Sequence, residues 1–232
     1  MTNIQSALGD SSDDLTEFWV EIPTGYVPLP TDAIDENMAV ATDVLHEQAD
    51  PDEQRVADVM IGMLTSYLHA LAARNGVYCG VGHHLSAVDG TAISSSLVVA
   101  LQEFPEKVNP RVLLKDLLVT KAQEGDEGQA DLVDVQGRPM LFVECSRELP
   151  TPRFPGVPEP ADGATSTVFQ LEALVPSEDG SKLVSVEFST PFVAHGPEFR
   201  TMLVTMAASV SFDPPEAAEW GRAVSISDML GG

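Results

Sequence analysis

Basic residues are scarce in this 232-residue chain, which has 12 lysines and arginines against 36 aspartates and glutamates. The formal net charge is therefore -24 at neutral pH, and Arg55 is the one basic residue among the first 60 positions. A surface this negative repels phosphate backbones and anionic lipid head groups. The composition thus argues against a nucleic-acid-binding or membrane-surface protein and favours a protein partner with basic character.

Long apolar runs and a cysteine framework are also missing. No stretch reaches the roughly eighteen apolar residues of a membrane span, and the N-terminus lacks the basic and apolar regions of an export signal. The sequence therefore predicts a soluble, cytoplasmic protein. In such a compartment the two cysteines, Cys79 and Cys145, are expected to be buried thiols rather than a disulfide.

Familiar catalytic motifs are absent as well. No Gly-x-Ser-x-Gly surrounds a serine, no His-Glu-x-x-His occurs, and no Gly-x-Gly-x-x-Gly links a strand to a helix. The segment "DGTAISSS" lacks the alternating acids of a calcium loop. We therefore expect no cofactor, no metal and no enzymatic activity.

The stretch most suggestive of chemistry is "YCGVGHH", residues 78–84. Alternation along a strand would place Cys79 and His83 on one face and Tyr78 and His84 on the other, so the adjacent histidines would diverge. Along that strand Cys79 and His83 would stand roughly 13 Å apart, too far for one ion. We interpret the segment as a strand whose glycines admit a close helix. The alternative is a metal or nucleophile site that Cys145 joins from a neighbouring strand.

Periodicity predicts an α+β fold in which an antiparallel β-sheet is flanked by helices on both faces. A short strand is expected over 18–22, followed by a proline-punctuated turn. Expected helices cover 34–48, 51–74, 109–122 and 196–212, and expected β-hairpins cover 77–104, 130–149 and 166–190. One domain, 17–213, would lie between a disordered acidic leader, 1–16, and a C-terminal tail, 214–232.

Three phrases carry a resemblance to a known family. They are "FWVEIPTGYVPLP" (18–30), "FQLEALVPSEDGSKLVSVEFSTP" (169–191) and "EFRTMLVTMAASVSFD" (198–213). Together with the element order, they make the chain similar to the Mog1p/PsbP-like α/β/α sandwich proteins, in an uncharacterised actinobacterial branch. The resemblance implies a binding or assembly factor rather than an enzyme, with a link to an actinobacterial secretion system. It supplies no functional residues.

Two functional hypotheses remain open. In the first, the protein is a non-enzymatic interaction module, and its accessory contacts are Arg147, Arg153 and Phe154 at the proline-rich loop 150–163 and Trp220 in the tail. Arginine and exposed aromatic residues are typical interface anchors. In the alternative, a pocket between sheet and helices near His83 or Cys145 binds a small ligand or substrate. Glu144 and Glu172, both in expected strands, could form an inward acid pair there, although a solvent-facing position is the default.

Overall fold

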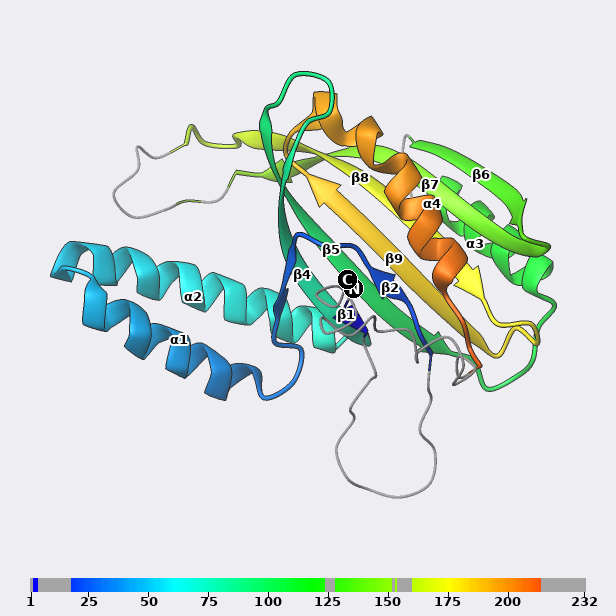
Figure 1. Cartoon of the computed structure of the whole chain (residues 1–232), viewed down its shortest axis with the longest axis horizontal. Helices are drawn as coiled ribbons and strands as arrows, with labels where there is room; N and C mark the ends of the chain where they lie inside the picture. Colours follow the sequence, from blue (N-terminus) through cyan, green and yellow to red (C-terminus); the bar gives the residue numbers. More distant parts are fainter. Residues whose placement is uncertain (1, 4–17, 124–127, 152, 154–159, 214–232) are drawn as a thin grey trace, which may run out of the picture.

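A seven-stranded antiparallel sheet forms the centre of the computed structural model, which describes residues 2–3, 18–123, 128–151, 153 and 160–213 (Figure 1). The strand order is β3-β4-β5-β9-β8-β7-β6. The strands are β3 (Tyr26–Leu29), β4 (Gly76–Leu85), β5 (Ala92–Glu103), β6 (Gly128–Val135), β7 (Arg138–Pro150), β8 (Thr165–Pro176) and β9 (Lys182–Thr190). The helices are α1 (Ile34–Gln48), α2 (Pro51–Ala72), α3 (Pro110–Gln123) and α4 (Arg200–Ser209). The α+β prediction is confirmed.

The three predicted hairpins are present, and their turns contain the residues that tight turns require. Gly90 has a φ of 73° between β4 and β5. Gln136 and Gly137 have φ values of 53° and 83° between β6 and β7, the pair of positive φ angles of a type I′ turn. Each turn fixes the register of its two strands, and hence which side chains share a face.

The two faces of the sheet are covered by different helices (Figure 1). On the first face, α4 packs over β8 and β9, where Leu203 and Met206 join the main core with Leu97, Val186 and Phe188. We call this the α4 face. On the other face α3 covers β7 and β8, and the end of α2 covers β4. We call this the α2/α3 face.

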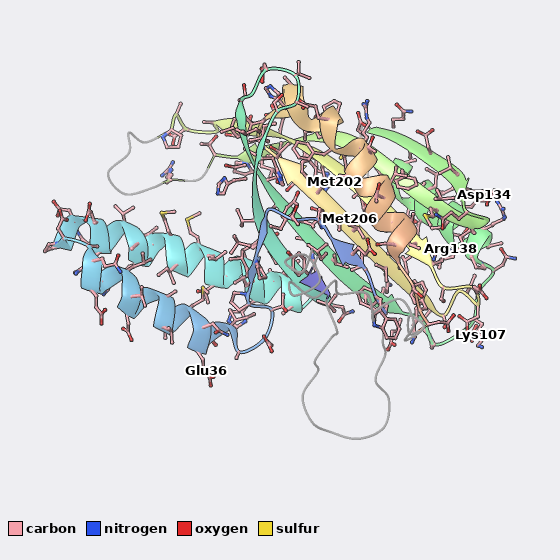
Figure 2. The ribbon with its side chains drawn as sticks, in the orientation of Figure 1. Glu36, Lys107, Asp134, Arg138, Met202 and Met206 are labelled. Atoms are coloured by element: carbon pink, nitrogen blue, oxygen red, sulfur yellow. The ribbon has the colours of Figure 1, made fainter. Side chains whose placement is uncertain are left out.

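The predicted helix over 196–212 is in fact two segments. A 3-10 helix, η1 (Val193–Phe199), contains Pro197, and the regular helix α4 begins only after it, since proline lacks the N–H that a continuous helix needs. A Cβ at Gly196 would lie 2.1 Å from the ring of Phe169, so no larger residue fits there. Arg138, labelled in Figure 2, donates hydrogen bonds to the carbonyls of Ala208 and Val210 and thereby caps the end of α4.

The N-terminal segment differs from the prediction in two ways. Residues expected to form a turn include the edge strand β3, which contains Pro28; proline is tolerated there because an edge strand needs no donor on its outer side. Within the leader expected to be disordered, β1 (Thr2–Asn3) pairs with β2 (Glu21–Ile22). The rest of that leader, 4–16, and the tail, 214–232, lie outside the described residues.

Candidate interaction surface

The accessory contacts predicted from the sequence are only partly described by the structure. Arg147 is exposed near the end of β7, and Arg153 pairs with Asp162 at 3.1 Å on the surface. Phe154 and Trp220 lie outside the described residues. The structure therefore leaves the role of these four residues as a prediction.

"YCGVGHH" is part of strand β4, as predicted, and its side chains alternate between the two faces. Cys79 is buried beneath α2, and burial raises the pKa of its thiol to about 11. His84 points to the α4 face, where it packs against the rings of Tyr26 and Phe199 and where burial lowers its pKa. The segment thus packs within the sheet. Burial favours the neutral forms of the Cys79 thiol and the His84 imidazole.

The observed strand order does not support a metal site shared by Cys79 and Cys145. Strands β5, β9 and β8 lie between Cys79 on β4 and Cys145 on β7, which puts the cysteines about 19 Å apart. Among the described residues, no group of three His, Cys, Asp or Glu side chains could hold a metal ion. His83 is exposed and lies 3.1 Å from the Ser94 hydroxyl, and Cys145 borders a shallow, open hollow.

The reason proposed for Gly80 and Gly82 of β4 is wrong. A Cβ at Gly80 would lie 2.5 Å from the Tyr78 hydroxyl, and one at Gly82 would lie 2.5 Å from His84 Nε2. Space at these positions is therefore taken by large side chains of β4 itself and, at Gly82, also by Tyr26 of β3, and not by a helix backbone.

An acid pair does exist on the sheet, but not the one that the sequence suggested. Glu144 is on the α4 face, where Arg200 donates two hydrogen bonds of 2.6 Å to it. Glu172 is on the α2/α3 face, bound to Lys121 of α3 at 2.6 Å. Its cross-strand neighbour is Glu187 of β9, whose pKa is raised by burial and by the charge of Glu172. The register of the β8–β9 hairpin brings these two carboxylates together.

A trough on the α4 face lies between α4 and the sheet edge at β6. It has a volume of about 450 Å³, and its apolar lining includes Val133, Phe142 and Leu203. The Arg200–Glu144 ion pair borders it. Such a volume falls within the range of small-molecule pockets.

An exposed apolar surface belongs to the helical hairpin formed by α1 and α2, which projects past the edge of the sheet (Figure 1). Its buried residues, Ile34, Met38 and Leu68, lie at the base of the hairpin. Helix α2 has 22 residues, all of them described, and Leu68 alone is buried. Towards the tip, Leu45 is 45% exposed and Met60 is 52% exposed.

These exposed side chains border a groove of about 760 Å³ between the two helices. Its lining includes Leu45 of α1 and Glu53, Val56, Met60, Ile61 and Leu64 of α2. Ile61 and Leu64 also pack on the cluster that contains Leu68 and Cys79. The groove is therefore a continuation of the surface with which α2 packs on the sheet, at a point where no described residue covers it.

Tyr67 lies one turn from Met63 along α2 and extends the apolar surface towards the sheet. Its ring is partly exposed, while its hydroxyl hydrogen-bonds with the Cys79 thiol. Burial of the hydroxyl end raises the pKa of Tyr67 to about 12. Tyr67 thus presents an apolar ring to solvent at neutral pH, with its polar end already satisfied.

The sequence did not predict the exposed surface of the hairpin, because its two helices were expected to pack on a face of the sheet. Apolar residues recur at spacings of three and four along α2 from Val56 to Leu71. The helix runs past the edge of the sheet (Figure 1), so the sheet covers only one end of this apolar stripe. One signal was available: the two helices are consecutive and joined by only two residues, which predicts that they pack on each other as a helical hairpin.

Comparison with known proteins assigns no relative, since no family model and no curated protein matches the chain. None of the helices in the described part of the chain combines the length and the apolarity that crossing a bilayer requires. What the structure defines is an α+β protein with an apolar helical hairpin that extends beyond its sheet.

Proposed function

We propose that the protein is a non-enzymatic interaction module that binds another protein through the groove of the α1–α2 hairpin. The observation that carries the proposal is the apolar groove between α1 and α2, whose lining side chains Leu45 and Met60 are about half exposed. Fully burying a side chain such as leucine or methionine stabilises by about 1.5–3 kcal/mol. Exposed apolar side chains gathered in one groove therefore favour association, and such patches mark interaction sites.

The experiment is capture of a partner from native lysate by tagged protein, compared between two double variants. The groove variant is Leu45→Ser with Met60→Ser, and the control is Val112→Ser with Val119→Ser on α3, where both valines are also exposed. We expect the wild type and the control to retain the same stoichiometric partner and the groove variant to lose it. Equal retention by all three proteins, with unchanged melting temperatures, would contradict the proposal.

Arg147, Arg153, Phe154 and Trp220 enter this proposal as accessory contacts. Replacing Arg153 and Phe154 together by alanine should weaken partner capture without lowering the melting temperature. Unchanged capture would remove the loop 150–163 from the interface.

We also propose that the chain is a distant Mog1p/PsbP-like protein acting in the cytoplasm, with a link to an actinobacterial secretion system. Its support is the antiparallel sheet with helices on both faces, and strand β9, which ends at Thr190 and is followed by Pro191 and the C-terminal helical segment. Members of that group act as binding or assembly factors, which agrees with an interaction module.

Small-ligand binding is the alternative function, and the trough beside α4 supports it better than the surroundings of His83 or Cys145 do. The trough has apolar walls and polar groups at one end, the usual make-up of a ligand site. A fragment screen by NMR, with Phe142→Ala as the variant, would show chemical-shift changes around Leu203 if ligands bind there.

A further inference from the structure

We infer that the occupant of the hairpin groove is a basic amphipathic helix of another protein. This inference rests on the proposed function and names the chemistry of the partner. It follows from the shape of the groove, from its charge and from the character of the other chains that could fill it.

The groove runs along one face of α2 and is long enough for a short helix. Its α2 lining recurs at Glu53, Val56, Met60 and Leu64, which are spaced by three and four residues. At 1.5 Å per residue these positions span about 16 Å, or three helical turns. An apolar stripe of the same spacing on a partner of about 12–15 residues would match it, as in other helix-in-groove complexes. The methionine in the lining can adapt its shape to such a stripe.

The negative charge of the hairpin favours a basic partner over a neutral or acidic one. From residue 34 to residue 72 the chain has eight acidic residues and one basic residue, Arg55, which gives a net charge of -7 with histidines neutral. Arg55 already pairs with Asp52. His46 and His69 are hydrogen-bonded to Asp58 and Asp35, so they too are engaged within the hairpin. Glu53 lines the groove itself. Complementary charge raises the association rate and rejects acidic partners.

The other available occupants carry the wrong charge. A second copy would bring its own -7 hairpin against this one. The chain's own ends are also acidic: residues 1–16 contain three aspartates and no basic residue, and residues 214–232 contain Glu216, Glu219 and Asp228 against Arg222. Like charges at an interface cost free energy, so a basic partner is favoured over both.

The test uses two synthetic 18-residue helical peptides with identical leucine positions, one with lysine and the other with glutamate at every remaining position. Isothermal titration calorimetry at about 150 mM NaCl, where long-range attraction is screened beyond about 8 Å, measures binding to the full chain. We expect the lysine peptide to bind wild type and the Val112→Ser/Val119→Ser control equally. Binding to the Leu45→Ser/Met60→Ser variant should be at least about tenfold weaker, a loss of about 1.4 kcal/mol. The glutamate peptide should show no measurable heat.

Several results would overturn the inference. Equal binding of the lysine peptide to all three proteins would show only general attraction to an acidic surface. Equal binding of both peptides in the groove would show that charge does not select the partner. If the groove variant loses its lysate partner while the wild type binds neither peptide, the proposed function stands and the partner is of another kind. A dimer that sedimentation detects in the wild type and not in the groove variant would assign the groove to a second copy.

Discussion

Glu172 and Glu187 lie opposite each other on neighbouring strands, and their different surroundings give them different roles. Glu172 is bound by Lys121 from α3. The pKa of Glu187 is raised first by burial and then by the charge of Glu172. Two carboxylates that face each other across a sheet destabilise it when both are ionised.

Replacing Glu187 by glutamine should therefore stabilise the protein at pH 7 by roughly 0.5–1 kcal/mol, the scale of a cross-strand charge pair. The folded-state pKa of Glu187 is raised, so its protonated form favours folding. That contribution is complete below the unfolded pKa and is lost as the pH rises through the folded pKa. The gain from glutamine should accordingly shrink between pH 7 and pH 4. Urea midpoints measured at both pH values test this.

Glu172→Gln is the matched control, because it removes the same like-charge contact but also breaks the ion pair with Lys121. Its gain at pH 7 should be smaller than that of Glu187→Gln, or negative. A loss of stability in Glu187→Gln at pH 7 would contradict this prediction and would mean that the contacts of Glu187 with Gln170, Arg147 and Lys121 outweigh the repulsion from Glu172.

The sequence could place Glu172 in a strand and even show which face it shares with Gln170. It also predicted the hairpin that makes β8 and β9 neighbours, but it did not fix the register, and Glu187 lies opposite Glu172 in one register only. The suggested pair with Glu144 failed because the register of β7 and β8 places Val143 opposite Glu172, so that Glu144 is on the other face.

At the scale of elements, the α1–α2 hairpin divides into a base that holds the fold and a tip that does not. Asp50 forms a capping box with Glu53 at the start of α2, so the helix has its own terminal support. At the base, Leu68 has no exposed surface and packs beside Cys79. We thus assign the stability of the fold to the base of α2 and the proposed recognition to the part nearer its tip.

Truncation at the two ends of α2 should therefore have very different effects. Leu68→Ala should cost about 2–5 kcal/mol, the range for a buried leucine in a packed core. Met60→Ala should stay within about 0.5 kcal/mol, as expected for a surface position. Chemical denaturation of both variants measures the difference. A large loss in Met60→Ala would mean that the groove is needed for folding, and this would weaken its assignment to a partner.

Most elements of this fold could be predicted because their signals are local. The capping box at Asp50, the turn at Gly90 and the Gln136–Gly137 turn each involve a few adjacent residues. The wrong predictions concern features that depend on contacts between residues far apart in the sequence. Strand β3 exists because β4 offers it an edge, and the apolar stripe of α2 is exposed because the sheet ends beneath it.

At the scale of the whole molecule, the net charge of -24 exerts repulsion throughout the folded state. Much of it lies at the surface, as Figure 2 shows for Glu36, which projects from α1 away from the sheet. Salt shortens the range of this repulsion, from about 30 Å at 0.01 M to about 10 Å at 0.1 M.

The melting temperature should therefore rise between 10 mM and 100 mM NaCl. A gain of about 1 kcal/mol would correspond to about 2–4 °C for a chain of this size. Differential scanning fluorimetry measures it, with Glu36→Gln/Glu47→Gln as the control variant, for which the rise should be smaller. A melting temperature that falls with salt would show that attractive ion pairs, such as Arg200–Glu144, outweigh the repulsion.

The position of the α1–α2 hairpin in the chain has an evolutionary consequence. The hairpin is inserted between β3 and β4, two strands that pair with each other at one edge of the sheet. Both ends of the insertion are fixed by that pairing, while its tip contacts little else. Descendants of this protein could lengthen, shorten or resurface the helical arm without shifting a strand, and so exchange one partner for another on an unchanged scaffold.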